Sequence, residues 1–267
     1  MNFEQDLDGL VWTAKSRMPG VPLEWEEAIV YATEKRIYAH WEDREKLLAE
    51  RPDFIHSLFT HKGRLYDTGS YPGIYDTLEN KRADFYKNIR ELAVSFNGDI
   101  YADTTDGKIV TKDNFQWFTL GAHNCLCAID EGEYKGLYLL EHKVGADHQQ
   151  TTSIRTHFTE FHKAPFERKY HMFADRLFTH EGKPYMVLAQ KVWDIIEDIS
   201  MDIISPVDPG INGFYSHKGI LYAHTGTGQI FDYATQDVIL EKKGSPIRHM
   251  CVAPASLIFG REKWPKR

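Results

Sequence analysis

The sequence lacks the features that mark secreted, membrane-spanning and nucleic-acid-binding proteins. Its N-terminal stretch, MNFEQDLDGLVW, carries acidic residues where a secretory signal needs a basic start followed by an apolar run. No segment approaches the roughly 20 consecutive apolar residues that span a bilayer. No run of Lys and Arg could neutralise a row of phosphates, and the formal net charge is −7. We therefore expect neither a membrane nor a nucleic acid as partner.

Cysteine is scarce, and the short motifs of the common enzyme classes are missing. The three cysteines, Cys125, Cys127 and Cys251, are odd in number and lack the spacing of a disulfide framework, which favours a cytoplasmic location. The sequence has no phosphate-binding loop, no G-x-G-x-x-G after a strand, no G-x-S-x-G and no H-E-x-x-H. We therefore expect no cofactor. An enzyme built on other residues stays open.

What the sequence does contain is an internal repeat. HKGRLYDTGSYPGIYD (His61 to Asp76) returns as HKGILYAHTGTGQIFD (His217 to Asp232). Further copies are NGDIYADTTDGKIVT and EGKPYMVLAQKVWD, with weaker ones in EKRIYAH, YKGLYLLEH and ASLIFG. The aromatic residue shared by the copies is Tyr38, Tyr66, Tyr101, Tyr138, Tyr185, Tyr222 and Phe259, at spacings of 28, 35, 37, 47, 37 and 37. Such a period is typical of a solenoid or a propeller.

Each repeat predicts a small antiparallel sheet. β-rich runs of five or six residues, such as ELAVSF and DIYADT, are separated by Asn97-Gly98 or by equivalent glycine turns, which are strong hairpin signals. A sheet of three or four strands cannot bury both faces alone. About seven such sheets closing radially would bury them.

The repeat G-x-L-Y followed by G-x-I-[YF]-D resembles that of the β-propeller superfamily across nearly the whole chain, without the signatures of a specific family. We predict an all-β protein, a propeller of about seven blades with six or eight as alternatives, in one domain over residues 1–267. The N-terminal DGLVWTAK resembles a third strand, and LIFG near the C-terminus a second strand, so we expect the N-terminal strand to join the last blade. The segment around 145–170 is over-long and predicts an irregular insertion.

Other polar residues that recur with the repeat are interpreted as structural. His61, His180 and His217 lie in the turn after the first strand of their repeats. Asp76, Asp194 and Asp232 end the third strand, where an Asp side chain commonly caps a turn.

Two clusters of potential metal ligands are not predicted to form sites. In HNCLC, His123 and Cys127 would lie about 13 Å apart along a strand at about 3.3 Å per residue. In HFTEFH, His157 would point away from Glu160 and His162 on a strand, so a shared site would need a turn. We predict no metal.

Ionisable residues are expected to converge on one mouth of the propeller's channel. In each blade the start of the innermost strand and the end of the second strand share a face of the ring. The candidates for ligand binding are Arg90, Arg248, Arg261, His249, His56 and Asp67. If the protein is an enzyme, the catalytic candidates are His224, Asp103 and His40.

Three functions follow from this placement. The first hypothesis is a module that binds a small-molecule ligand or a protein partner at the mouth, with the arginines favouring an acidic group. The alternative is a hydrolase or lyase with a His/Asp general acid–base pair at the same mouth. The third is an assembly scaffold, which an exposed aromatic patch around Tyr71, Tyr75 and Trp264 would favour.

Overall fold

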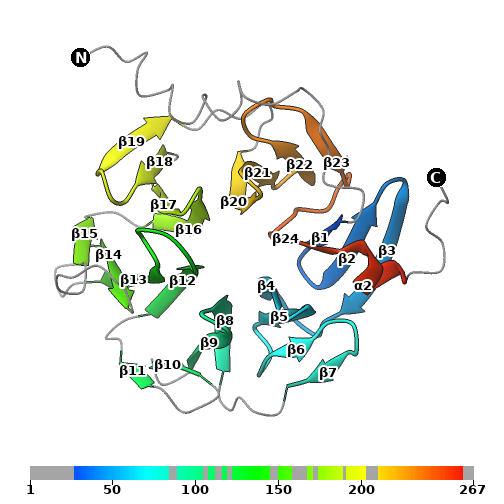
Figure 1. Cartoon of the computed structure of the whole chain (residues 1–267), viewed down its shortest axis with the longest axis horizontal. Helices are drawn as coiled ribbons and strands as arrows, with labels where there is room; N and C mark the ends of the chain where they lie inside the picture. The colour runs from blue at the N-terminus through cyan, green and yellow to red at the C-terminus, as the bar shows by residue number, and fades with distance from the viewer. Residues whose placement is uncertain are drawn as a thin grey trace.

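The protein folds into a ring of four-stranded antiparallel sheets. The computed structural model describes residues 27–83, 89–104, 108–111, 116–118, 122–144, 150–157, 167–170, 174–188, 191–202 and 210–260. Within these ranges the elements are strands apart from the short helix α2 (Ala255–Phe259), and no helix is long and apolar enough to cross a membrane. Figure 1 shows six sheets placed radially around a centre, which defines a six-bladed β-propeller.

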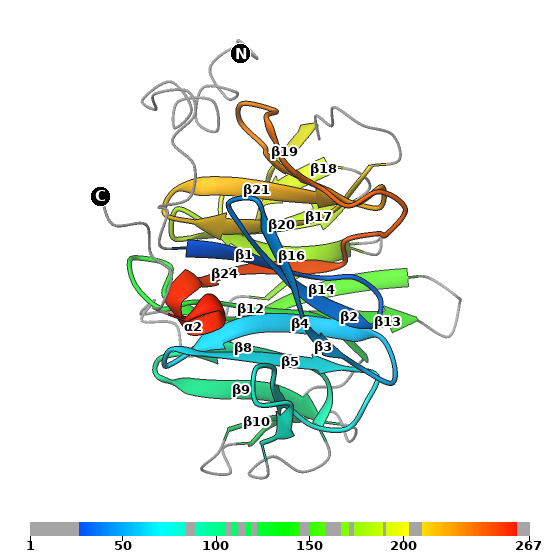
Figure 2. The same ribbon diagram turned by 90° about the vertical axis from the view of Figure 1, so that its right-hand side faces the viewer.

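Five blades are meanders whose first strand in sequence lies innermost, and in the closing blade the innermost strand is the last of the chain. Figure 2 shows the innermost strands β4, β8 and β24 running roughly along the ring axis. From the centre outward, the closing blade holds β24 (His249–Pro254), β1 (Glu27–Ala32), β2 (Arg36–Trp41) and β3 (Arg44–Glu50). The next holds β4 (Ile55–His61), β5 (Arg64–Gly69), β6 (Tyr75–Asp76) and β7 (Lys81–Arg82). The third holds β8 (Ile89–Phe96), β9 (Asp99–Thr104), β10 (Lys108–Val110) and β11 (Gln116–Phe118).

The remaining three blades follow the same order. The fourth holds β12 (Ala122–Ile129), β13 (Gly136–Val144), β14 (Gln150–His157) and β15 (Glu167–Tyr170). The fifth holds β16 (Ala174–His180), β17 (Lys183–Leu188), β18 (Lys191–Asp194) and β19 (Ile199–Asp202). The sixth holds β20 (Ile211–His217), β21 (Ile220–Thr225), β22 (Gln229–Asp232) and β23 (Val238–Glu241). The over-long segment 145–170 thus supplies two blade strands, β14 and β15.

Six blades is the smallest of the three counts that the repeat spacing left open. The expected first and last copies both lie in the closing blade, because Tyr38 belongs to its third strand and Phe259 to α2. In the closing blade the second strand is β1. Its aromatic residue is Tyr31, which lies opposite Met250 of β24 and is fully buried. The weak copy ASLIFG forms the helix α2 and not a strand.

The ends of the chain close the ring together, as predicted. β24 pairs with β1 in a continuous register from Glu27 opposite Pro254 to Ala32 opposite His249. The closing N-terminal strand is thus β1, in second place beside β24, whereas the DGLVWTAK segment lies outside the described residues. Helix α2 packs on these two strands, and the Lys46 ammonium donates to the carbonyl of Ile258 at 2.9 Å.

The hydrophobic core lies between blades. Alternate residues of a strand point to opposite faces, so each sheet packs on both neighbours. In β5, Leu65 joins the cluster shared with the closing blade, and Tyr66 joins the cluster shared with the β8 blade. Six such clusters of buried side chains in the described residues each join two neighbouring blades. The repeated aromatic residues are therefore fold-determining.

The recurring histidines link each blade to the next. His61 Nδ1 lies 2.9 Å from Ser95 Oγ of the β8 blade, and His180 Nδ1 lies 2.9 Å from Ser216 Oγ of the β20 blade. His217 Nε2 lies 3.0 Å from a carboxylate oxygen of Glu27 in the closing blade. The structural interpretation is confirmed, although these side chains bind a neighbouring blade and not only their own turn.

The recurring aspartates cap turns, as predicted. One carboxylate oxygen of Asp76 accepts from the backbone N–H groups of Leu78 and Glu79 at 3.2 and 3.1 Å. Asp194 and Asp232 accept in the same way from the residues two and three positions further on. These side chains stabilise the connection between the third and fourth strands.

Candidate functional site

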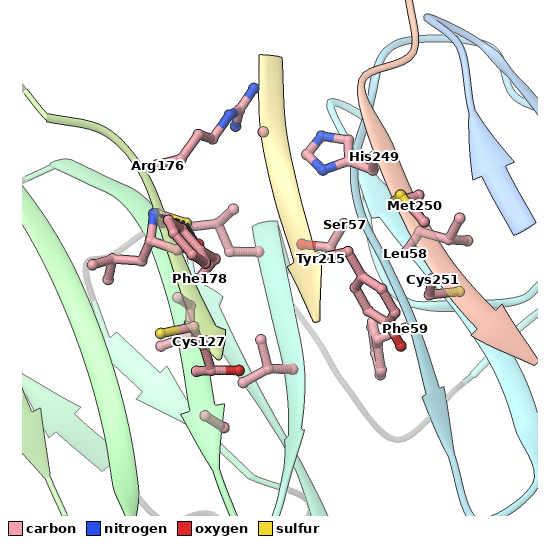
Figure 3. Close-up of a pocket in the computed structure, with 18 of the residues that line it drawn as sticks. Ser57, Leu58, Phe59, Cys127, Arg176, Phe178, Tyr215, His249, Met250 and Cys251 are labelled. Atoms are coloured by element: carbon pink, nitrogen blue, oxygen red, sulfur yellow. Dashed lines mark hydrogen bonds between the residues drawn. The ribbon is translucent and has the colours of Figure 1, made fainter. Parts of the chain in front are cut away.

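The innermost strands enclose a central channel of about 470 Å³. All six of them contribute lining residues, which Figure 3 shows in close-up. The volume falls within the range of roughly 300–1,000 Å³ that is typical of small-molecule sites. The channel is therefore large enough to hold a ligand.

Bulges set the direction of the side chains at one mouth. Five innermost strands shift register near their first residues, for example between Ile55 and Ser57 of β4 and between Ala174 and Arg176 of β16. A bulge inserts one extra residue and re-aims the side chains beside it. The bulged ends lie at the same mouth, because the innermost strands all start there.

Positively charged and imidazole side chains gather at this bulged mouth. We name it the cationic mouth, formed by His56, Arg176, Arg248 and His249, all of which line the channel. Figure 3 shows Arg176 and His249 on either side of β20, drawn in yellow. Between them β20 carries Gly213, whose missing side chain makes room for the buried His224 ring: a Cβ there would lie 2.7 Å from His224 Nε2.

A hydrogen-bond network holds Arg176 in position. Arg176 Nε donates to the backbone carbonyl of Asn212 at 3.3 Å, and Asn212 Nδ2 donates to the carbonyl of Ile247 at 3.1 Å. His224 Nδ1 donates to the same carbonyl of Ile247 at 3.0 Å. The network joins three blades, so the guanidinium is anchored through Nε.

The charge of Arg176 has no acidic partner in the described part of the chain, where its one hydrogen bond goes to a backbone carbonyl. Arg248 lies 3.7 Å from Glu34, and both side chains are largely exposed, so this ion pair contributes little. His56 Nε2 lies 2.8 Å from Ser70 Oγ. The cationic mouth therefore holds two guanidinium groups whose charge is available to an anion.

The two imidazoles nearest Arg176 are neutral at pH 7. Burial lowers the pKa of His224 from 6.5 to about 4, with the carbonyl of Ile247 opposing this change and Arg176 adding to it. Burial also lowers the pKa of His249 well below its usual value, and the surrounding positive groups lower it further: Arg176, His224, His56 and Arg248. An anion at the mouth would reverse this repulsion and favour protonated His249.

The structure does not bring the two main catalytic candidates together. Asp103 is fully buried in β9 and accepts the backbone N–H of Leu92 at 2.6 Å. His224 is buried in β21, and a Cβ built on Gly213 would lie only 2.7 Å from its Nε2. Their blades lie on opposite sides of the ring (Figure 1), so they cannot form the expected acid–base pair.

The third catalytic candidate, His40, lies away from the mouth. It was expected at the end of a second strand, but β2 is the third strand of the closing blade, because β24 supplies the innermost one. His40 pairs with Ile29 and Glu45, at the end of the sheet far from the bulged mouth.

Asp67 is part of a buried ion pair. A guanidinium nitrogen of Arg51 lies 2.7 Å from its carboxylate, and both side chains are almost completely buried. Arg51 also bonds Asn80 and lies over the Tyr75 ring, 4.8 Å from its centre. The pair joins the segment before β4 to its blade, so Asp67 is not available to a ligand.

The remaining ligand-binding candidates divide into three groups. His56, Arg248 and His249 lie together in the cationic mouth. Arg90 belongs to the start of β8, and its side chain lies outside the described part of the chain. Arg261 lies outside the described residues.

Arg176 is the residue that sequence reasoning missed. Its segment DRLFTHEG aligns with HSLFTHKG of the β4 blade, where the adjacent His56 was recognised. This alignment places Arg176 beside a recognised candidate and could have identified it as a residue of the mouth. The register shift that aims it could not be seen from the sequence.

Within the described residues, no group of three His, Cys, Asp or Glu side chains is arranged to hold a metal ion. Burial raises the pKa values of the Cys125, Cys127 and Cys251 thiols. Cys125 Sγ accepts the backbone N–H of Leu177 at 3.2 Å. The side chains of the HFTEFH cluster lie outside the described residues.

Comparison with known proteins supports the fold. Neither a protein-family model nor a curated protein matches the sequence. A chain in the crystal structure of a nidogen/laminin complex is similar with a TM-score of 0.59 and 12% identity, over 85% of this chain and 98% of that chain. The N-terminal domain of Nup159 gives a TM-score of 0.43 at 10% identity, over 85% and 73% of the two chains. The computationally designed Ika8 protein gives 0.41 at 11%, over 87% and 82%. The first likeness shows the fold alone.

Proposed function

We propose that this β-propeller is a binding module that recognises an anionic group at the cationic mouth. The ligand is a small anion or an acidic segment of a partner protein. The observation that carries the proposal is Arg176, which is anchored through Nε, is free of an acidic partner in the described residues, and lines the channel together with His249.

Physical reasoning supports this assignment over the two alternatives. Guanidinium groups bind carboxylates and phosphates through charge-assisted, often bidentate hydrogen bonds. An acid–base pair of His224 and Asp103 would need both side chains at one place, and they belong to opposite blades. The aromatic patch considered for a scaffold would need an exposed Tyr71, which is only 3% exposed.

Calorimetric titration of the full chain tests the proposal, with citrate, inorganic phosphate and an Asp-rich hexapeptide as probes. We expect saturable binding of at least one probe and at least a tenfold weaker affinity after Arg176→Gln, because the substitution keeps a polar side chain but removes the charge.

The matched control is Arg36→Gln. Arg36 is exposed and lies 3.3 Å from Glu50 on an outer strand, so its loss changes the net charge equally without touching the mouth. The affinity of this variant should equal that of the parent. Absence of binding for every anionic probe, including the carboxylates and octyl phosphate named below, or an equal loss in the two variants, would contradict the proposal.

A further inference from the structure

Below the cationic mouth the channel changes character in layers. Two residues further along each innermost strand, the lining is apolar or aromatic, with half-buried Phe59, Val94 and Tyr215. At about 3.3 Å per residue, this apolar layer lies roughly 7 Å below the level of Arg176. Figure 3 shows Phe59 and Tyr215 beneath the level of Arg176 and His249.

The next position along the strands is small or hydroxylated. It is occupied by Thr60, Ser95, Ala128, Thr179 and Ser216, all of which line the channel. Two of these hydroxyls, on Ser95 and Ser216, already bond the linking histidines His61 and His180. The apolar layer is therefore bounded by charge on one side and by hydroxyl groups on the other.

We propose that the channel binds a small amphiphilic anion, with its carboxylate or phosphate group between Arg176 and His249. Its short apolar chain extends along the channel axis into the layer of Phe59, Val94 and Tyr215. This inference rests on the proposed function and adds the class and orientation of the ligand.

Charge and geometry both favour this occupant. A purely polar anion would leave the apolar layer in contact with water, whereas an apolar chain would remove that surface from water. A cationic amphiphile would meet two guanidinium groups at the mouth. The hydroxyl layer begins about 10 Å below Arg176, at three residues of about 3.3 Å each, and this depth limits the length of the apolar chain.

Titration with a homologous series tests the inference. The probes are acetate, butyrate, hexanoate and octanoate, with octyl phosphate to compare head groups and octylamine to reverse the charge. We expect the affinity to rise about fourfold per methylene, at about 0.8 kcal/mol per buried group, until the chain fills the apolar layer. Octylamine should not bind. Octyl phosphate binding more tightly than octanoate would identify phosphate as the preferred head group, and the reverse order would identify carboxylate.

Variants separate the chain site from the head site. Val94→Thr keeps the shape of the side chain and adds a hydroxyl, so it should weaken octanoate severalfold and leave acetate unchanged. Val94→Trp would fill the apolar layer and remove the chain-length dependence. Arg176→Gln should weaken every anion at least tenfold, and Arg36→Gln none.

The outcomes distinguish failure of the inference from failure of the proposed function. Binding of acetate or inorganic phosphate that depends on Arg176 but does not increase with chain length would overturn the amphiphile and leave the anion site standing. Octylamine binding as tightly as octanoate would overturn the assignment of charge. Absence of Arg176-dependent binding for every probe, citrate and the acidic peptide included, would overturn both.

Discussion

His224 lies beneath the backbone of Gly213 and donates Nδ1–H to the carbonyl of Ile247, so its imidazole is shielded from water. The sequence placed this side chain at the mouth but could not show that it faces into the protein. The difference matters chemically, because a buried neutral imidazole supports its neighbours and does not exchange protons readily with a substrate.

Replacing His224 should change how stability depends on pH. In the unfolded chain the imidazole binds a proton below about 6.5, whereas in the folded protein it does so only below about 4. The unfolded state therefore binds more protons between these values, so the free energy of unfolding rises with pH across this window. The contribution of this one group is at most about 3.5 kcal/mol, at about 1.4 kcal/mol per pKa unit.

The variant His224→Asn keeps an N–H donor for Ile247 and removes the titration. Its unfolding free energy in urea, measured from pH 4 to 7, should rise less steeply than that of the parent, by up to one proton equivalent. The other groups near this site, Arg176 and His249, remain in the variant. Cys251→Ala is the control: it also removes buried side-chain volume, and its slope should match the parent's. An unchanged slope in His224→Asn would show that His224 does not titrate in this window.

The hairpin turns between the first and second strands of four blades share one backbone conformation but differ in their residues. Lys62-Gly63, Asn97-Gly98, Glu181-Gly182 and Lys218-Gly219 all have positive φ at both positions. Asn tolerates this conformation, whereas Lys and Glu adopt it at a cost of about 1–2 kcal/mol. Asn97-Gly98 is thus the favourable version of the turn.

Exchanging the residues of two turns should shift stability in opposite directions. Lys62→Asn is expected to raise the free energy of unfolding by about 0.5–1 kcal/mol, because it relieves the left-handed strain without altering a described hydrogen bond. Asn97→Lys is expected to lower it by a similar amount. Urea unfolding midpoints at constant m-value would measure both. A change of the same sign in the two variants would contradict the argument.

At the scale of the element, the sequence predicts strands and turns well and strand ends poorly. Glycine turns and alternating apolar residues have local causes, so DIYADT and its turn could be read directly. The bulges near Ser57 and Arg176 lie at the start of the innermost strands, and the repeat pattern of the sequence did not indicate them. The directions of the side chains in the cationic mouth could therefore be known only from the tertiary structure.

The whole molecule is held as a ring by one pair of strands, β1 and β24. Val30 of β1 lies directly opposite Cys251 of β24, and both side chains belong to the same buried cluster. Opposite residues of an antiparallel pair have Cα atoms about 4.5–5.5 Å apart, which is within the range that a disulfide bridges.

Val30→Cys should therefore form a disulfide with Cys251 under oxidising refolding. The bond would close a loop from residue 30 to residue 251 and raise the free energy of unfolding by about 3–5 kcal/mol, by restricting the unfolded chain. Mass spectrometry identifies the bond, and urea unfolding with and without reductant measures its effect. Val30→Cys combined with Cys251→Ser is the control that cannot form it. Failure of the two thiols to form the bond would contradict the pairing of β1 with β24, and equal midpoints for the oxidised and reduced forms would contradict the expected stabilisation.

The number of blades could not be predicted without knowing which strands form the closing sheet. Repeats predicted a propeller because their period is a property of each blade, but counting blades required knowing which strand completes which sheet. Tyr38 and Phe259 resembled two separate copies, yet both belong to the blade that the chain ends build together. The pairing of two distant segments cannot be predicted from the sequence of either segment alone.

The pairing of β1 with β24 also has a consequence for synthesis on the ribosome. At about 5–20 residues per second, some 220 residues separate the emergence of the two strands by roughly 10–45 s. During that interval β1 presents to the cell an unpaired edge and the apolar face of Tyr31, which packs on the β20 blade only when the ring closes. The first strand of the ring thus depends on the last, and the nascent chain must remain soluble until β24 arrives.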